Sequence, residues 1–456
     1  RSISPSNGSM PRSARRASVV AAIVAAVVMG SCRGSLSRAP EPEVRPPGAR
    51  DTLRTDTIAG DTAFPLMPGP GRVIRGARIR VALVPGAPSA GITGSGRWTI
   101  LDRDGLTAAV AGSGERWTVA ARSGRLRAIR EDDGWSISLS APAVLRAIAD
   151  GTRLSVGPRE YRGELVVHVD GDALTVVNRL AIEDYLRGVV PLEIGERAES
   201  ERAAVEAQAI AARSYAYSHL VPTRRFDVRA TVDDQVYGGV NAERPLADAA
   251  VAATAGQVLR YEDRIADAPY HSTCGGSTAE PGEVWNGERG APYLKRVSDR
   301  IPGTDRYYCD PSPRFQWTRT MGGDDMAAAV TRYLRGRGSR ATLGTVRGVR
   351  IESWTASGRV GTLVLESSSG EDVRLRGNEI RYALRPAGGE LLNSTYFSVE
   401  RGGSRGGERE FVLRGRGYGH GIGMCQWGAI GRARAGQDAA TILRTYYPGT
   451  SVGIVQ

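Results

Sequence analysis

One acidic residue has the surroundings that acid–base catalysis needs. Glu193 lies in the run 189–195, VVPLEIG, where its neighbours are apolar. Burial among apolar groups disfavours a charged carboxylate and raises its pKa. A carboxyl group that stays protonated near neutral pH can donate a proton to a leaving oxygen. The same run also fits a partly exposed loop residue, so the acid role of Glu193 is a hypothesis at this point.

Two of the four histidines stand in glycine-rich runs. His271 belongs to 270–276, YHSTCGG, and His420 belongs to 417–423, GYGHGIG. Several glycines around one histidine indicate unusual backbone dihedral angles or a close approach to a ligand. A tight loop that packs its histidine is the alternative.

The cysteines near these histidines suggest a metal site. His271 and Cys274 have the spacing of paired zinc ligands. Cys309 would add a third ligand, and His420 or Cys425 a fourth, so one structural zinc ion at His271, Cys274 and Cys309 is predicted. A disulfide between Cys274 and Cys309, with Cys425 buried, is the alternative in an oxidising compartment. The sequence leaves both open.

A long helix is predicted directly after Glu193. Residues Glu201–Leu220 are rich in alanine, and Ser200 is the expected N-cap. Gln208 and Tyr215 fall on one stripe of this helix. A shorter helix is expected over Ile182–Val189.

The rest of the chain predicts an α+β fold, because helices and strands alternate without regular βαβ units. A β-rich N-terminal part is expected at 72–158, and a mixed core at 159–456 with an insert at about 307–410. Strands are predicted over Arg78–Val84, Trp98–Leu101, Trp117–Ala121, Ser136–Leu139, Glu164–Val169, Leu174–Asn178, Val258–Tyr261, Ala268–Ser272, Val349–Trp354 and Gly361–Glu366. Further helices are predicted over Pro245–Thr254, Asp325–Leu334, Cys425–Ala435 and Ala439–Tyr446.

Five sequence blocks resemble, in order, the stage II sporulation protein D family, whose core is also called the SpoIID/LytB domain. The blocks are 183–193 with 206–216, then 235–239, 271–278, 377–381 and 417–429. The resemblance runs from about residue 72 to the C-terminus. The chain departs from the family at Gly195, where members usually carry proline, and at Asp234, where a small hydroxyl residue is common.

This resemblance implies a lytic transglycosylase that cleaves peptidoglycan glycan between N-acetylmuramic acid and N-acetylglucosamine, preferably in strands without stem peptides. Glu193 corresponds to the catalytic acid. It would protonate the glycosidic oxygen and then help to deprotonate the C6 hydroxyl, which closes a 1,6-anhydro ring without water. Residues expected to bind or position the glycan are Gln208, Arg213, Tyr215, Gln235, Tyr237, Ser272, His420 and Gln426.

Two other functions remain as alternatives. Some members of the family are described as enhancers of a muramyl-amide amidase, which makes a non-catalytic glycan- or amidase-binding module the main one. A zinc hydrolase that uses His271, Cys274 and His420 is the other. Thiolate-rich zinc sites are more often structural, and a catalytic zinc needs an open coordination position.

The N-terminal segment predicts export. Three arginines precede an apolar run at 17–29, which ends in Gly30-Ser31-Cys32. This is the pattern of a secretory signal, shorter than the roughly 20 residues that span a bilayer. Small residues before Cys32 resemble a lipobox, so a lipid-anchored protein of the cell envelope is expected, with a plain cleaved signal as the alternative. Residues 33–71 predict a disordered tether rich in Pro, Gly, Arg and Asp.

The charge of the chain fits an anionic partner. The net charge is +12, which attracts anionic envelope polymers. Glycan strands become such polymers when loss of stem peptides frees their lactyl carboxylates. Nucleic acid is not expected as a partner, because the chain carries an export signal and no basic run interleaved with aromatic residues.

Overall fold

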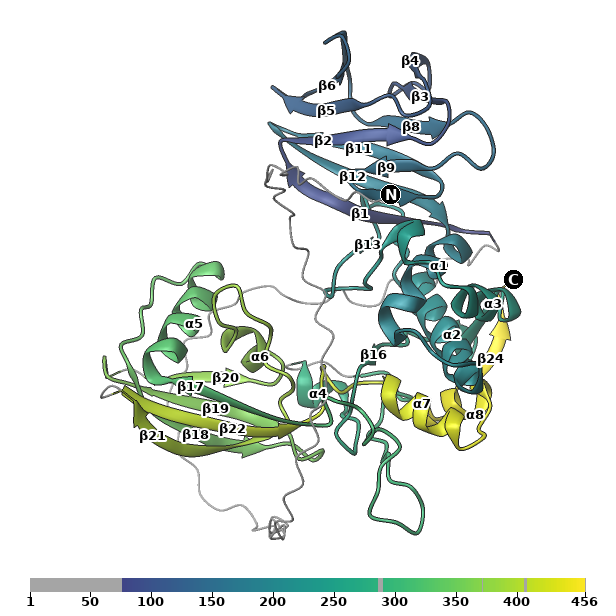
Figure 1. The fold of residues 1–456 in the computed structure, drawn as a ribbon. Helices are drawn as coiled ribbons and strands as arrows, with labels where there is room; N and C mark the ends of the chain where they lie inside the picture. The colour runs from purple at the N-terminus through teal and green to yellow at the C-terminus, as the bar shows by residue number, and fades with distance from the viewer. Residues whose placement is uncertain (1–75, 286–289, 371, 406–407, 456) are drawn as a thin grey trace, which may run out of the picture. The chain divides into compact units, whose positions relative to one another are not determined.

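The computed structural model describes residues 76–285, 290–370, 372–405 and 408–455 (Figure 1). The predicted α+β class is confirmed. The expected signal segment, Cys32 and the tether lie outside the described residues. Among the residues described, no helix has the length and apolar character needed to cross a membrane.

The N-terminal part consists of two packed sheets. Its strands are β1 (Arg78–Ala87), β2 (Ser89–Gly94), β3 (Trp98–Leu101), β4 (Thr107–Ala111), β5 (Trp117–Arg122), β6 (Arg125–Arg130), β7 (Ser136–Leu139), β8 (Ala143–Ala147), β9 (Leu154–Val156), β10 (Arg159–Tyr161), β11 (Glu164–Asp170), β12 (Ala173–Ala181) and β13 (Val228–Arg229). The sheet orders are β13-β1-β12-β11-β8-β3-β4 and β10-β9-β2-β5-β6-β7. Trp98 and Trp117, one from each sheet, are fully buried with ring centroids 6.3 Å apart in an edge-to-face contact.

The seven-stranded sheet continues across residue 158, where the sequence suggested a boundary. β12 pairs with β1, so that Ala181 lies opposite Arg78. β11 and β12, which contain the predicted strands Glu164–Val169 and Leu174–Asn178, form a hairpin, and Gly171 in its turn has a φ of 61°. One hydrophobic core therefore joins the sheets to the helices that follow.

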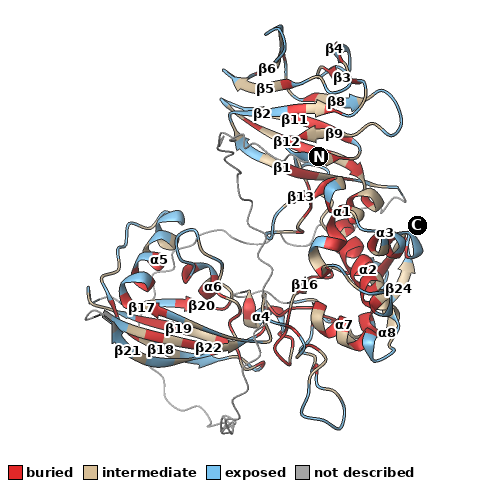
Figure 2. Cartoon of the chain, viewed as in Figure 1, coloured by how far each residue is buried: buried red, intermediate tan, exposed pale blue. Residues whose placement is uncertain are grey.

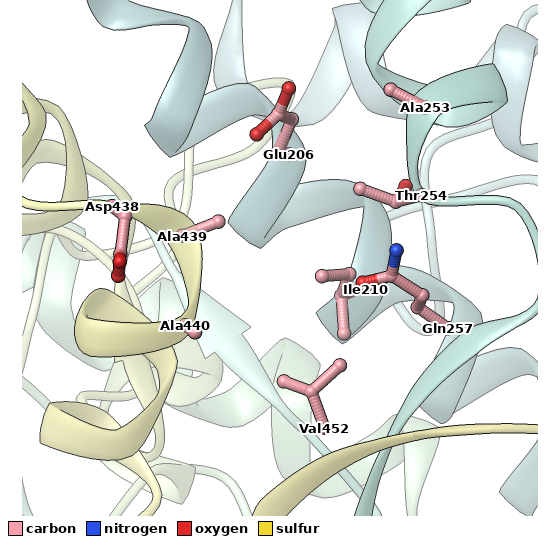
Figure 3. A pocket seen from close by; sticks show the side chains of 9 residues that line it. All are labelled: Glu206, Ile210, Ala253, Thr254, Gln257, Asp438, Ala439, Ala440 and Val452. Carbon is pink, nitrogen blue, oxygen red and sulfur yellow. The ribbon is translucent and has the colours of Figure 1, made fainter.

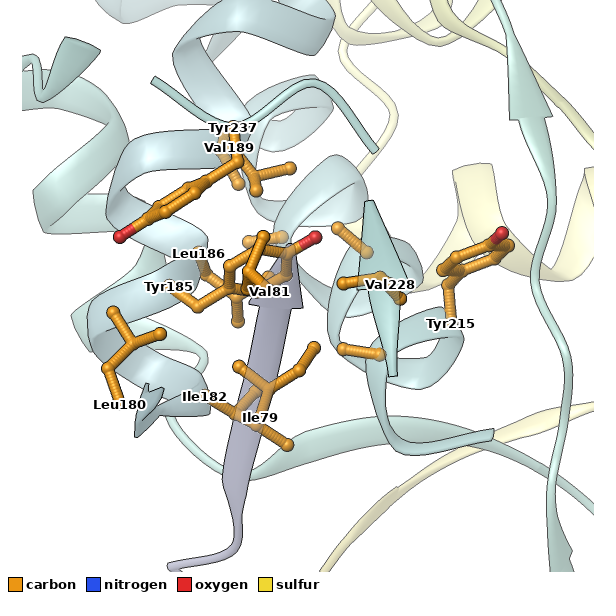
Figure 4. Packing of buried hydrophobic residues seen from close by; sticks show 14 of the residues in the cluster. Ile79, Val81, Leu180, Ile182, Tyr185, Leu186, Val189, Tyr215, Val228 and Tyr237 are labelled. Atoms are coloured by element: carbon orange, nitrogen blue, oxygen red, sulfur yellow. The ribbon is translucent and has the colours of Figure 1, made fainter. Parts of the chain in front are cut away.

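Helix α1 (Ile182–Ile194) follows β12 directly and carries Glu193 in its last turn. It runs five residues beyond the predicted end at Val189. Pro191 lies inside its last turn, where proline removes one backbone hydrogen bond, and the helix ends three residues later at Ile194. Figure 4 shows Tyr185, Leu186 and Val189 of α1 packed near β1 in this core.

Helix α2 (Arg202–Ser218) packs against α1 and is nearly covered by protein (Figure 2). Ser200 is not its N-cap, contrary to the prediction. A 3₁₀ turn at Glu199–Glu201 precedes α2, and the Glu201 Oε2 accepts a hydrogen bond of 3.1 Å from the backbone N–H of Ala198. This bond closes the 3₁₀ turn, whereas no side-chain hydrogen bond caps the N-terminus of α2 itself.

The C-terminal helices of the chain pack against α2. Strand β16 (Tyr270–His271) pairs in parallel with β23 (Met424–Cys425). Helix α7 (Gln426–Arg434) and helix α8 (Ala439–Tyr446) follow and both contact α2. The last strand, β24 (Ser451–Ile454), pairs with β14 (Gln257–Tyr261), which follows α3 (Pro245–Ala253); β15 (Arg264–Ile265) lies at the other edge of β14.

Residues between β16 and β23 include a unit with its own hydrophobic core. Met326, Leu363 and Phe411 lie in this second cluster. Its elements are β17 (Gln316–Gly322), α5 (Gly323–Gly336), β18 (Val346–Trp354), β19 (Val360–Ser367), β20 (Val373–Arg376), α6 (Glu379–Ala383), β21 (Phe397–Arg405) and β22 (Glu408–Arg416). They form the sheets β17-β22-β21 and β18-β19-β20, and the short helix α4 (Pro281–Val284) precedes them.

Candidate active site

Glu193 is a carboxyl group with a strongly shifted pKa. Burial raises the pKa of Glu193 to about 7, while the backbone N–H of Val236 and the side chain of Gln426 act in the opposite direction. The Val236 N–H donates to Glu193 Oε1 over 2.7 Å. The residue remains partly exposed, so a ligand can reach it. At neutral pH this group exists in both protonation states, as an acid/base catalyst requires.

A chain of tyrosine and glutamine side chains lies beside Glu193. Gln235 accepts a hydrogen bond from the Tyr185 hydroxyl over 3.0 Å and donates to the Tyr270 hydroxyl over 2.8 Å. Burial raises the pKa of Tyr270 well above its usual value, and the charge of Glu193 raises it further. Tyr270 was not among the predicted site residues. It directly precedes His271, the first residue of a recognised block.

Two more predicted residues meet at this site. Gln426 Nε2 donates to Gln208 Oε1 over 3.3 Å, which joins α7 to α2. The other amide atom of this pair, Gln208 Nε2, is buried without a hydrogen-bond partner. A buried unpaired donor is costly, so it is a candidate to bind a buried water molecule.

Tyr215 lies on the same side of α2 as Gln208. Its hydroxyl donates to Asp234 Oδ1 over 3.2 Å, and its ring stacks on His219 with centroids 3.8 Å apart. Asp234 also accepts from the backbone N–H of Arg229 over 2.9 Å. Asp234, where the family often has a small hydroxyl residue, therefore holds both the tyrosine and its own loop.

Arg213 and Tyr237 have structural contacts instead of the predicted contacts with substrate. The Arg213 side chain is fully buried and pairs with Glu183 over 2.7 Å, with further bonds to the carbonyls of Val251 and Gln257. The Tyr237 hydroxyl donates to Asn178 over 2.9 Å, and only 1% of the residue is exposed. Neither side chain offers a surface to a glycan, because both complete the packing of α1 and α2.

His420 and Ser272 hold neighbouring segments of the site in place through hydrogen bonds. His420 Nε2 lies 2.9 Å from the Tyr270 carbonyl, and its Nδ1 accepts from the backbone N–H of Ile422 over 3.1 Å. Both ring nitrogens are therefore engaged. The Ser272 carbonyl accepts from the N–H of Trp427 over 3.0 Å. These contacts hold Tyr270 and the start of α7 in position.

Four buried side chains next to β16 could hold a metal ion. The ligand atoms of Cys274, Asp299, Cys309 and Cys425 all lie within 4.8 Å of one another. The sulfurs of Cys274 and Cys309 are 3.4 Å apart, whereas a disulfide bond measures about 2.05 Å. The three cysteines in the described part of the chain are free thiols, so the alternative disulfide is not formed in this structure.

The three sulfurs differ in acidity: hydrogen bonding with Cys274 raises the pKa of Cys309 and burial raises that of Cys425, so a metal ion must displace both of these thiol protons. Cys425 Sγ accepts from the N–H groups of Cys274 over 3.1 Å and of Gly428 over 3.3 Å. Burial raises the pKa of Cys274, but hydrogen bonds with Cys309, Cys425 and His271 outweigh burial and hold it well below its usual value. Three thiolates and a carboxylate form a ligand set that zinc accepts.

The group contains two of the three predicted ligands and adds Asp299. His271 lies outside the four-residue group, but its Nδ1 is 3.1 Å from the Ile422 carbonyl and its buried ring also interacts with the Cys274 sulfur. Histidines that bind metals often show this arrangement. Asp299 was missed because only the fold brings it to the Tyr446 hydroxyl, 2.7 Å away, and to Arg432.

A hollow of about 260 Å³ lies on the other face of α2 (Figure 3). Glu206 and Ile210 line it, together with residues next to α3 and at the start of α8. Because Glu206 and Gln208 are two positions apart, they project to nearly opposite sides of the helix. This hollow is therefore separate from the Glu193 site, and none of the predicted site residues lines it.

Comparison with known proteins gives two family matches. Residues 170–261 match SpoIID, described as stage II sporulation protein. Residues 304–423 match a domain of unknown function, DUF8618. The second match contains the whole of the insert expected at about 307–410.

Three similar proteins come from two organisms. An uncharacterised protein of Brachyspira hyodysenteriae is 29% identical over 296 residues, which cover 64% of this chain and 72% of that protein. The amidase enhancer of Bacillus subtilis is 28% identical, over 59% of this chain and 40% of its own length. Stage II sporulation protein D of the same organism is 29% identical, over 60% of this chain and 75% of its own length.

Proposed function

Given that this chain contains a SpoIID domain and is distantly homologous to an amidase enhancer and to stage II sporulation protein D, we propose that it is a lytic transglycosylase. Its substrate is the bond between N-acetylmuramic acid and N-acetylglucosamine in peptidoglycan glycan strands, preferably strands without stem peptides. The observation that carries the proposal is the partly exposed Glu193, whose pKa burial raises to about 7.

The reaction needs only this one carboxyl group. Protonated Glu193 gives its proton to the glycosidic oxygen as the bond from that oxygen to the anomeric carbon breaks. The resulting carboxylate takes the proton of the C6 hydroxyl, whose oxygen bonds to the anomeric carbon and closes the 1,6-anhydro ring. The carboxyl group is thereby restored and no water is consumed. The Val236 N–H and Gln426 stabilise the transient carboxylate.

The surrounding buried side chains hold the site in position. Gln208 Oε1 accepts from Gln426, the residue that also hydrogen-bonds Glu193. The Tyr270 hydroxyl, held by Gln235, faces the same carboxyl group. Gln208 and Gln235 therefore position Gln426 and Tyr270 beside Glu193, which performs the proton transfers.

A second function has support from one comparison. The similar Bacillus subtilis protein is named an amidase enhancer, so this chain could act as a glycan- or amidase-binding module. The two functions differ in their need for Glu193. A binding module works without a carboxyl group at this position, and a transglycosylase does not.

Two further proposals concern the protein's location and its metal content. We propose an exported envelope protein anchored through a lipid on Cys32, since the N-terminal run has the pattern of a lipoprotein signal. We also propose one zinc ion held by Cys274, Asp299, Cys309 and Cys425. When bound, zinc would cross-link the segments around β16 and β23; a role in the reaction is not part of the proposal.

The decisive experiment is mass spectrometry of peptide-free glycan strands incubated with the protein. Products that end in 1,6-anhydro-muramic acid support the proposal if Glu193→Gln abolishes them and Glu196→Gln does not. Glu196 is a suitable control because its side chain is 77% exposed and pairs only at the surface with Arg244. Reducing-end products would indicate a hydrolase. No cleavage by folded protein would favour the binding module.

A further inference from the structure

A second hollow, of about 470 Å³, lies between the core and the unit that follows it. Its volume is within the roughly 300–1,000 Å³ of typical small-molecule sites. Residues from the segment 275–307 form one side, and Ser357 and Tyr396 form the other. Glu193 is not among its lining residues. We call this hollow the junction cleft.

The side chains of the junction cleft suit a sugar that carries a carboxylate. Tyr307 and Tyr396 supply aromatic rings, and Ser277 and Ser298 supply hydroxyl groups. Arg296 is exposed, donates only to the neutral carbonyl of Ala356, and has no acidic partner within the described part of the chain. A guanidinium group matches a carboxylate, and aromatic rings and hydroxyls match the faces and edges of a sugar ring.

Two other arginines affect the charge of the cleft. Arg300 also lines it, although the highly exposed Asp305 partly offsets its charge. Arg359 lies beneath the cleft floor, only 2% exposed, and donates to the carbonyls of Cys274 over 2.9 Å and Ser277 over 3.1 Å. Its Nε and Nη1 have no hydrogen-bond partners. The charges of Cys274 and Glu283 offset that of Arg359. Arg296 and Arg300 therefore supply the positive charge that faces the cleft.

The backbone at Gly276 forms part of the floor of the junction cleft, and this position requires glycine. Gly276 has a φ of 116°, and a Cβ at this position would lie 2.9 Å from the Tyr307 ring. Only a residue without a side chain lets the backbone pass under Tyr307 in this conformation. The aromatic ring and the polar backbone therefore face one space.

We propose that the junction cleft binds an N-acetylmuramic acid unit with a free lactyl carboxylate, in the same glycan strand that is held at Glu193. This inference rests on the proposed function for its ligand. Tyr270, at the Glu193 site, and Gly275, in the cleft, are five residues apart, so their Cα atoms are separated by at most about 18 Å. A strand of several sugars spans both sites, and binding at two sites strengthens binding of long strands only.

Binding can be measured without cleavage in the full chain carrying Glu193→Gln. The test variant adds Arg296→Gln and Arg300→Gln, and the probes are labelled peptide-free strands of about four and about twenty sugars. The control adds Arg350→Gln and Arg374→Gln instead, which removes the same charge from exposed positions of β18 and β20. We expect about tenfold weaker binding of the long strands by the test variant, less than twofold change for the short strands, and little change in the control.

A third variant separates shape from charge. Ser298→Trp fills the junction cleft and leaves the charge unchanged, and it should weaken long-strand binding to a similar extent. The inference would be overturned if the test variant lost as much affinity for short strands as for long ones, or if the control variant lost as much affinity as the test variant. An equal loss of affinity for uncharged N-acetylglucosamine oligomers would also overturn it. So would a preference of the cleft for a phosphate polymer. If the wild-type protein cleaves nothing but the length-dependent loss remains, the transglycosylase proposal fails and the junction cleft stands.

Discussion

Gln208 and Arg213 lie five residues apart in α2 and face different sides of the protein. By helical geometry their directions differ by about 140°. Gln208 meets Gln426 beside Glu193, whereas Arg213 pairs with Glu183 and the carbonyls around α3. One helix thus carries a site residue on one face and a structural residue on the other.

Substitution of Arg213 should therefore affect stability and leave substrate binding unchanged. Arg213→Ala removes a buried guanidinium group and leaves several carbonyls and Glu183 unpaired, with an expected loss on the order of 3 kcal/mol in the free energy of unfolding. Denaturant unfolding measures the loss, and kinetics on the folded fraction should give an unchanged KM. A raised KM at normal stability would return Arg213 to the substrate-binding residues.

Glu193→Gln should abolish the anhydro product. The amide cannot donate a proton as an acid, so the rate should fall by about 10²–10⁴-fold. Single-turnover kinetics with peptide-free strands provides the measurement, and Glu196→Gln is the matched control. Retention of more than a tenth of the rate would exclude Glu193 as the acid.

The activity should decline as the pH rises above about 7, because the acid form of Glu193 is lost at its raised pKa. The profile of kcat/KM against pH should fall by up to tenfold per pH unit on that side. Gln426→Leu removes a group that lowers this pKa, so its alkaline limb should move to higher pH. If the alkaline limb of Gln426→Leu stayed at the same pH, a group other than Glu193 would control the pH profile.

Folding stability gives an independent test of the same pKa. The pKa of Glu193 is about 7 in the folded chain against 4.5 unperturbed. Unfolding therefore releases a proton between these values, and stability falls as the pH rises through this window. Glu193→Gln should thus stabilise the protein relative to wild type by about 1–3 kcal/mol more at pH 8 than at pH 4. Denaturant unfolding at the two pH values measures this difference, and equal differences would contradict a raised pKa.

Gly195 should not tolerate the proline that is usual in the family. Gly195 ends α1 with a φ of 75°, and proline is restricted to a φ near −65°. Gly195→Pro should lower stability by about 3 kcal/mol, and Gly195→Ala by about 1–2 kcal/mol. Gly91→Ala is the control, because a methyl group there meets no atom within 4 Å and φ is not positive. Thermal unfolding compares the three variants, and an unchanged Tm for Gly195→Pro would mean that α1 ends differently.

The cysteine cluster should bind about one zinc ion per chain. Cys425→Ser should lower the affinity for zinc by at least tenfold, and a chelator should lower the Tm of the wild type but not of this variant. Metal analysis and thermal unfolding are the measurements, with Asp305→Asn, an exposed carboxylate of the same segment, as the control. A zinc-free protein with a Cys274–Cys309 disulfide would support the other alternative.

The sequence predicted the individual strands better than it predicted which strands pair with one another. Alternation and β-branched residues placed Trp98–Leu101 and Ser136–Leu139 to the residue. Glycine-rich and short strands such as β2 and β9 were missed because they have little periodicity of their own. The sheet that crosses residue 158 could not be foreseen, since pairing of β1 with β12 depends on contacts about a hundred residues apart.

The site shows the same limit. Glu193, Gln208, Gln235 and Gln426 were predicted and lie together, because recognised blocks contain them. Residue type did not distinguish Arg213, which is buried in an ion pair, from a substrate ligand. Asp299 carries no local signal, and its role depends on the last two helices.

The parallel pairing of β16 with β23 has a consequence for the order of synthesis. A growing chain that ends before residue 424 possesses Glu193 and α2 but has neither β23 nor Gln426. Its carboxyl group lacks one of the partners that set its acidity, and the cysteine cluster lacks Cys425. Residues 424–426 thus complete the site, and a nascent chain has no finished site until these residues have been synthesised.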